Sequence, residues 1–153
     1  MTNLITNATS SFGLTSLDQT AARTVVEIPS ADAIINAYDI VTWVAMTTDT
    51  VPTVKQADVS ATTDIALIAG VALNSVTAVG DIVRVVRQGP AIVSCDDATI
   101  AVGDLCTFHA TVDGACDGAV GSAALINGDY FGTALSANDV PGTNQVIVDV
   151  GSV

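Results

Sequence analysis

The feature that most constrains this chain is a series of short apolar runs, rich in Val, Ile and Ala, which turn residues interrupt about every ten positions from residue 25 onward. The clearest runs cover residues 40–46, 65–73, 82–87, 91–95, 105–112 and 145–150. Runs of this length, bounded by Gly, Asp, Asn and Pro, are typical of β-strands. The sequence therefore predicts a mainly β fold, a compact β-barrel or sandwich.

The connections between these runs also have recognisable chemistry. Residues 87–90 (Arg-Gln-Gly-Pro) and 112–114 (Val-Asp-Gly) predict hairpin turns, because Gly supplies positive φ and Pro cannot continue a central strand ladder. One helical turn is expected at residues 30–36.

The sequence repeats itself at two levels. Ala-Val-Gly-Asp occurs at residues 78–81 and again at 101–104, with a weaker version, Asn-Ala-Tyr-Asp, at 36–39. A longer repeat relates residues 70–73 (Gly-Val-Ala-Leu) to 132–135 (Gly-Thr-Ala-Leu), and in both a second glycine follows ten positions after the first. These patterns predict a tight turn in which Gly relaxes the backbone and Asp accepts a backbone N–H, within a strand–loop–strand unit that is used twice.

Residues 1–24 differ from the rest of the chain. They are rich in Thr, Ser and Asn, and apolar side chains occur at scattered points such as Ile5, Phe12, Leu14 and Leu17. A segment without apolar periodicity cannot bury enough surface to form its own core. We therefore predict an extended N-terminal arm at residues 1–24, whose four apolar residues are candidate contacts with a neighbouring subunit, and a β-rich domain at residues 25–153.

The charge of the chain excludes several classes of partner. Sixteen Asp and Glu residues against four Lys and Arg residues give a net charge of −12. Nucleic acids and anionic membranes attract clustered Lys and Arg, so neither is expected as a partner. No apolar run approaches the ~18 residues that a membrane-spanning helix needs, and no secretory signal pattern opens the chain, so we expect synthesis in a cytoplasm.

The residues capable of chemistry do not form a convincing site. Cys95, Cys106, Cys116 and His109 have the composition of a Cys₃His zinc site. Cys106 and His109 are three residues apart, however, and would point to opposite faces of a strand. No second histidine is present to act as a base. We expect reduced thiols, no metal, no cofactor and no enzymatic activity.

Trp43, Arg84 and Arg87 complete the candidate interface residues. The two arginines supply half of the positive charge within four positions. They would either pair with acidic side chains on neighbouring strands or contact an acidic partner, since Arg is enriched in interfaces. Trp43 would belong either to the core or to an interface, and the sequence leaves both readings open.

Several of these motifs together resemble a known family. Apolar, Gly-Asp and closing-strand motifs occur in a fixed order at residues 68–73, 79–85, 89–91, 101–105, 130–135 and 146–150. In this order they resemble the bacteriophage capsid decoration (cement) proteins, over about residue 32 to the C-terminus. The resemblance implies a homotrimer that binds the major capsid protein on the outer surface of the virion and stabilises the head. The alternative is a virion-surface module for host attachment or glycan binding.

Overall fold

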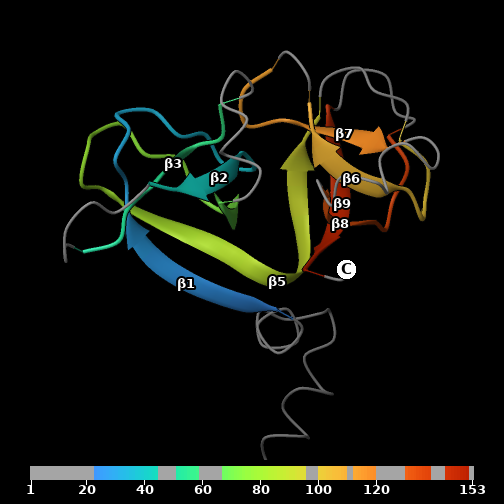
Figure 1. The fold of residues 1–153 in the computed structure, drawn as a ribbon, viewed down its shortest axis with the longest axis horizontal. Coiled ribbons are helices and arrows are strands. Elements are labelled where there is room, and N and C mark those ends of the chain that lie inside the picture. The colour runs from blue at the N-terminus through green and yellow to red at the C-terminus, as the bar shows by residue number, and fades with distance from the viewer. Residues whose placement is uncertain are drawn as a thin grey trace, which may run out of the picture.

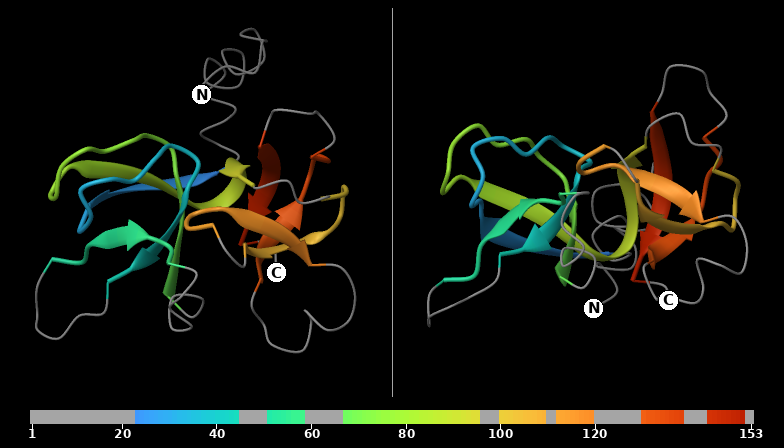
Figure 2. Two further views of the ribbon diagram at one scale, coloured as in Figure 1. Left: turned by 90° about the horizontal axis from the view of Figure 1, so that it is seen from above. Right: turned by 45° about the horizontal axis from the view of Figure 1, so that its top comes forward.

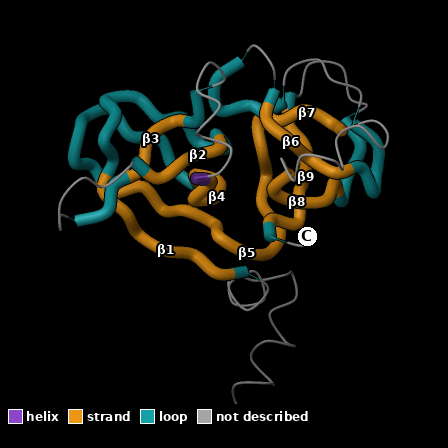
Figure 3. The backbone as a smooth tube through the Cα atoms, viewed as in Figure 1, coloured by secondary structure: helices purple, strands orange, loops and turns teal. Residues whose placement is uncertain are grey.

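The computed structural model describes residues 23–44, 51–58, 67–95, 100–109, 112–119, 130–138 and 144–151. Nearly all of these residues belong to strands or to the turns and loops that join them (Figure 3). The strands are β1 (Thr24–Pro29), β2 (Ile40–Trp43), β3 (Val54–Gln56), β4 (Ile68–Ala72), β5 (Ile82–Ser94), β6 (Leu105–Phe108), β7 (Cys116–Ala119), β8 (Tyr130–Ala134) and β9 (Gln145–Val150). The predicted mainly β, barrel-like fold is confirmed. Within the described residues, no helix is long and apolar enough to cross a membrane.

All paired strands belong to one curled antiparallel sheet. Its order is β3-β2-β4-β5-β9-β8-β6-β7, and β1 pairs with β5 beside this path. The long strand β5 passes through two lobes that lie side by side (Figures 1 and 2). Lobe 1 contains β1 to β4 with residues 82–88 of β5, and lobe 2 contains residues 89–94 of β5 with β6 to β9.

The two lobes are copies of one strand arrangement. Lobe 1 has the order β3-β2-β4-β5-β1, and lobe 2 has the order β7-β6-β8-β9-β5. The registers agree as well, since Val41 lies opposite Gly70 in lobe 1 and Cys106 lies opposite Gly132 in lobe 2, and each pair is followed by a register shift. Isolated parallel bridges, Ser30 to Val54 and Cys95 to Cys116, occupy equivalent places. The predicted repeated unit is confirmed and extends over most of each lobe.

The predicted turn before an Asp occurs at all three expected places, with Tyr38 in the position of the glycine at the third. The residue before each Asp has positive φ, which is 91° at Gly80, 92° at Gly103 and 78° at Tyr38. The Asp Oδ2 atom accepts the backbone N–H of the residue three positions earlier, at 3.1 Å for Asp81, 2.8 Å for Asp104 and 2.8 Å for Asp39. A strand begins directly after each Asp, so the turn sets the start of β5, β6 and β2.

Two clusters of buried side chains hold the lobes together. The lobe 1 cluster contains Ile28, Ile35, Val41, Val54, Ala69, Ala72, Val76, Val83 and Val85. The second cluster fills lobe 2 and also includes residues from the other face of the lobe 1 sheet, namely Ile40, Ala57, Val71 and Val86. Lobe 2 therefore covers part of the outer face of lobe 1, and apolar burial of this kind contributes about 25 cal/mol per Å².

Two close approaches between paired strands require glycine. A Cβ atom on Gly70 of β4 would overlap the Val86 carbonyl oxygen, and one on Gly132 of β8 would overlap the Asp149 carbonyl oxygen. The two glycines are equivalent in the two lobes, so each lobe needs the same close approach between its third strand and the next.

Two sequence predictions of local structure were wrong. Residues 87–90 do not form a hairpin, because β5 continues through them. Gly89, with φ of 93°, lies where the neighbour of β5 changes from β1 to β9, and its positive φ bends the strand without reversing it. Residues 30–36 are not helical, since Ser30 and Ile35 form bridges to Val54 and Val76.

The remaining local predictions agree with the structure in different degrees. Residues 112–114 lie in the turn between β6 and β7, as expected, and β9 coincides with the predicted run 145–150. Strands β2, β4 and β6 are shorter than their predicted runs. The predicted arm lies outside the described residues except for Arg23 and Thr24, of which Thr24 begins β1.

Candidate functional site

Two predicted interface residues, Trp43 and Arg87, meet in lobe 1. Trp43 ends β2 and packs, half-buried, against the lobe 1 cluster. The Arg87 guanidinium carbon lies 5.6 Å from the centre of the Trp43 ring. A cation over an aromatic face at this distance contributes about 0.5–1 kcal/mol where it is exposed. Trp43 is therefore a core residue at least in part, with the Arg87 guanidinium over its ring.

Arg84 lies on the opposite face of β5. It is exposed and lies directly opposite Glu27 of β1 in the strand register. Cross-strand pairs of opposite charge contribute roughly 0.2–1 kcal/mol. This arrangement accounts for Arg84 without a partner protein, so its role in an interface stays a prediction.

The other four candidates, Ile5, Phe12, Leu14 and Leu17, lie outside the described residues.

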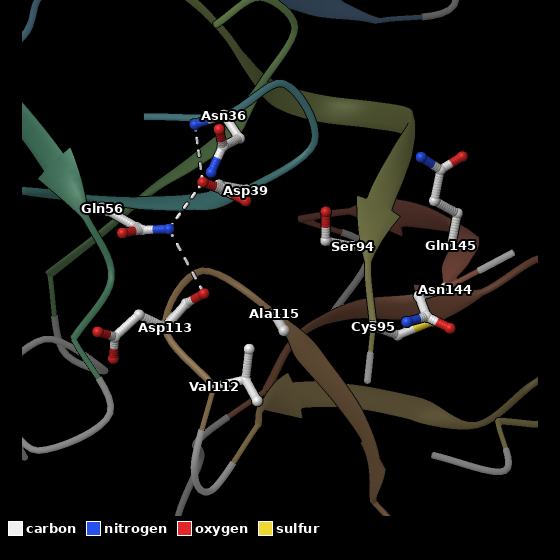
Figure 4. A pocket seen from close by; sticks show the side chains of 10 residues that line it. All are labelled: Asn36, Asp39, Gln56, Ser94, Cys95, Val112, Asp113, Ala115, Asn144 and Gln145. Atoms are coloured by element: carbon white, nitrogen blue, oxygen red, sulfur yellow. Dashed lines mark hydrogen bonds between the residues drawn. The ribbon is translucent and has the colours of Figure 1, made fainter. Parts of the chain in front are cut away.

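A polar cavity of about 500 Å³ lies where the two lobes meet (Figure 4). Most of its lining residues carry amide, carboxylate or hydroxyl groups, and they come from both lobes: Asn36, Asp39, Gln56, Ser94, Cys95, Val112, Asp113, Ala115, Asn144 and Gln145. The sequence did not reveal this cavity, because its lining residues are spread over more than a hundred positions in the chain.

Asp39 is the most constrained polar group of the cavity. It is only 5% exposed, and its Oδ2 atom accepts hydrogen bonds from the Asn36 backbone N–H and from the Gln56 side-chain amide, each at 2.8 Å. Burial raises the pKa of Asp39 above its usual value of 3.8, although the hydrogen bonds from Asn36 and Gln56 oppose this change. Gln56 also donates to the Asp113 carbonyl oxygen at 3.5 Å and so links the two lobes.

Backbone hydrogen bonds fix the lobes around the cavity. The Ile40 N–H donates to the Gly114 carbonyl oxygen at 2.7 Å, and the Gly114 N–H donates to the Ala57 carbonyl oxygen at 3.0 Å. The Ser94 N–H donates to the Tyr38 carbonyl oxygen at 2.9 Å. A Cβ atom on Gly114 would come within 2.8 Å of the Asp39 side chain, so only glycine fits at this contact.

The three cysteines converge in the core of lobe 2. Cys95, Cys106 and Cys116 are buried, and none of the three is in a disulfide. Contact with the Cys106 and Cys95 thiols, together with burial, raises the pKa of the Cys116 thiol. Since the thiolate is the reactive form, Cys116 is a poor nucleophile.

One ring nitrogen of His109, Nδ1, is engaged in a turn and not in the thiol cluster. The His109 Nδ1 atom accepts the Val112 N–H at 3.1 Å and closes the turn between β6 and β7. In the described part of the chain, no group of three or more His, Cys, Asp or Glu side chains is arranged to hold a metal ion.

The chain therefore has a mainly β fold with two lobes, which the continuous strand β5 joins and between which the cavity lies. The chain is similar in fold to a solved structure, the N base of head fiber gp8.5 of bacteriophage phi29, with a TM-score of 0.57 and 18% sequence identity. The similarity covers 83% of this chain and 94% of the phi29 chain. No protein-family model matches the sequence, and no curated protein matches it.

Proposed function

We propose that this chain is a structural, non-enzymatic protein of a bacteriophage head, which binds the outer surface of the capsid as a homotrimeric decoration protein. The observation that carries the proposal is the fold similarity over 94% of a chain that is described as the base of a phage head fiber. The order of the Gly-Asp turns and apolar strands, which resembles the capsid cement proteins, supports the same role.

The surface chemistry fits binding to protein better than binding to nucleic acid. A net charge of −12 repels phosphate groups, which leaves a protein shell as the compatible part of a virion. A ligand that binds only the assembled shell stabilises it by mass action, so the proposed activity is a rise in the resistance of the head to opening.

The test uses the full chain and empty heads assembled from the major capsid protein of the same phage. We expect the protein to sediment with the heads at saturable stoichiometry, to raise the temperature at which they open, and to appear as trimers on their outer surface by cryo-electron microscopy. Heads that neither bind the protein nor change in stability would contradict the proposal.

A second candidate function, attachment to a host glycan, is favoured by the cavity between the lobes. Its amide and carboxylate groups suit a ligand rich in hydroxyl groups, such as a monosaccharide unit of a cell-wall polymer. Binding of the isolated protein to host cell walls, abolished by Asn144→Ala and absent for heads without the protein, would favour this function over shell stabilisation.

A further inference from the structure

The cavity between the lobes is lined by carboxyl groups but by no positively charged side chain. Of its 10 lining residues, Asp39 and Asp113 are acidic, and none is Lys, Arg or His. Most of the others carry amide or hydroxyl oxygen atoms, which accept hydrogen bonds, and Val112 and Ala115 add an apolar part. A cavity of this composition is complementary to a cation that carries hydrogen-bond donors.

Asp39 is the lining residue that most needs a positive partner. Its side chain is only 5% exposed, and its hydrogen bonds from the Asn36 N–H and the Gln56 amide come from neutral donors. In the part of the chain that the structure describes, no Lys, Arg or His side chain contributes to the environment of this carboxyl group. Burial without a counter-charge destabilises the ionised form of a carboxyl group, so a cation in the cavity would stabilise it.

The hydrogen bonds of Asp39 discriminate between kinds of cation. A guanidinium binds best when both oxygens of a carboxylate accept its fork of N–H groups, but Asp39 Oδ2 already accepts two hydrogen bonds at 2.8 Å. An alkyl ammonium group is a compact charge with three donors, which can bond to Oδ1 and to oxygen atoms across the cavity, such as that of Ser94 (Figure 4). Val112 and Ala115 suit the methylene groups that follow such a charge.

We propose that the cavity between the lobes is a binding site for an alkyl ammonium group, which pairs with Asp39 and lies with its carbon chain against Val112 and Ala115. The group can belong to a free polyamine or to a lysine side chain of a partner protein. The inference does not depend on the proposed role on a phage head, and it differs from glycan binding because the ligand must carry a positive charge.

The first test compares two small probes of similar size, n-butylamine, which is a cation at pH 7, and n-butanol, which is neutral. Titration of the full chain is followed by NMR through the amide signals of Gln56 and Gly114, which border the cavity. We expect saturable shifts with n-butylamine and an affinity at least roughly 10-fold weaker for n-butanol, since a hydrogen bond to a charged group is the stronger one. Equal affinities, or no saturable shift with n-butylamine, overturn the proposal.

The second test uses Asp39→Asn, which removes the charge and retains an oxygen for the turn before β2. Asp104→Asn is the matched control, because Asp104 forms the same turn in lobe 2, with the Ala101 N–H at 2.8 Å, and does not line the cavity. We expect the affinity for n-butylamine to fall at least roughly 10-fold in Asp39→Asn and to be unchanged in Asp104→Asn. An Asp39→Asn protein that is folded by circular dichroism and binds n-butylamine as wild type does overturns the proposal.

The pH dependence of binding gives an independent measurement on the wild-type chain. Asp39 must lose its proton to pair with an ammonium group, so the affinity for n-butylamine should rise between about pH 4 and pH 7. Asp113 and Cys95 also line the cavity, and Asp32 accepts the Gln56 backbone N–H at 2.9 Å. All three remain in Asp39→Asn, so a pH dependence that this variant loses belongs to Asp39. A wild-type affinity that does not vary with pH overturns the proposal.

The source of the ammonium group is distinguished by two further probes, spermidine and Nα-acetyl-lysine amide. Each is titrated into wild type and Asp39→Asn. A larger loss of affinity for spermidine identifies a free polyamine as the ligand, and a larger loss for the lysine amide identifies a side chain of a partner protein. If neither affinity depends on Asp39, the proposal is wrong.

Discussion

At the scale of single residues, the buried carboxylate of Asp39 links local turn geometry to the junction between the lobes. Its pKa is raised in the folded protein, so the folded state holds a proton more tightly than the unfolded state does. The resulting contribution to stability is fully present below the unfolded pKa of 3.8 and is lost as pH rises through the folded pKa.

We therefore predict that Asp39→Asn, which cannot titrate, gains stability relative to wild type as pH rises. The difference in melting temperature, variant minus wild type, should increase between about pH 4 and pH 7. Thermal melts of both proteins across this range are the measurement. A difference that does not vary with pH would show that Asp39 has an ordinary pKa.

A second residue-scale prediction concerns Gly70, where β4 approaches its neighbour β5 most closely. Gly70→Ala places a Cβ against the Val86 carbonyl, in addition to the strain of its φ of 144°. We expect a loss of about 3 kcal/mol or more, or failure to fold. Gly103→Ala is the control, because its φ is 92° but nothing lies within 4 Å of its Cβ, and it should lose only about 1–2 kcal/mol. Equal losses in chemical denaturation would contradict the role assigned to the close approach.

At the scale of secondary structure, the Asp turns are the elements that the sequence predicted best. Gly at positive φ and an Asp oxygen within reach of the N–H three residues earlier are local requirements, so four letters suffice to recognise them. Strand β9 was equally clear, because its alternation of buried and exposed residues is visible in the sequence.

The misses at this scale have a common physical origin in tertiary contacts. Residues 87–90 have the composition of a hairpin, yet Gly89 bends one continuous strand, because β1 pairs with the residues before the bend and β9 with those after it. Strand β3, with the sequence Val-Lys-Gln, and strand β7, with Cys-Asp-Gly-Ala, have little intrinsic strand character and form by pairing with β2 and β6. The cavity was unpredictable for the same reason, since only the docking of the lobes assembles it.

We predict that the turn before β6 depends on the Asp104 side-chain oxygen and not on its charge. Asp104→Ala removes the acceptor for the Ala101 N–H and should cost about 1 kcal/mol. Asp104→Asn retains an oxygen at the same place and should lose less than half of that. Chemical denaturation measures both variants, and equal losses would show that the charge is what matters.

At the scale of the whole molecule, the division between arm and β-rich domain has a direct test. We predict that deletion of residues 1–20 leaves the melting temperature unchanged, because this segment has no apolar periodicity with which to bury surface in a core. We also predict that the deletion weakens binding to heads, since Ile5, Phe12, Leu14 and Leu17 are then absent. Unfolding would place the segment in the core, and unchanged binding would show that it is dispensable.

The continuity of β5 has a mechanical consequence. A force that separates the two lobes is carried in part along this strand, because its first half is hydrogen-bonded to β1 and its second half to β9. Load in that direction acts on the hydrogen bonds of each ladder together, in shear, whereas a hinge between two separate domains would extend at low force. In the proposed role on a phage head, which is under internal pressure, β5 would make the chain resist extension between its two lobes.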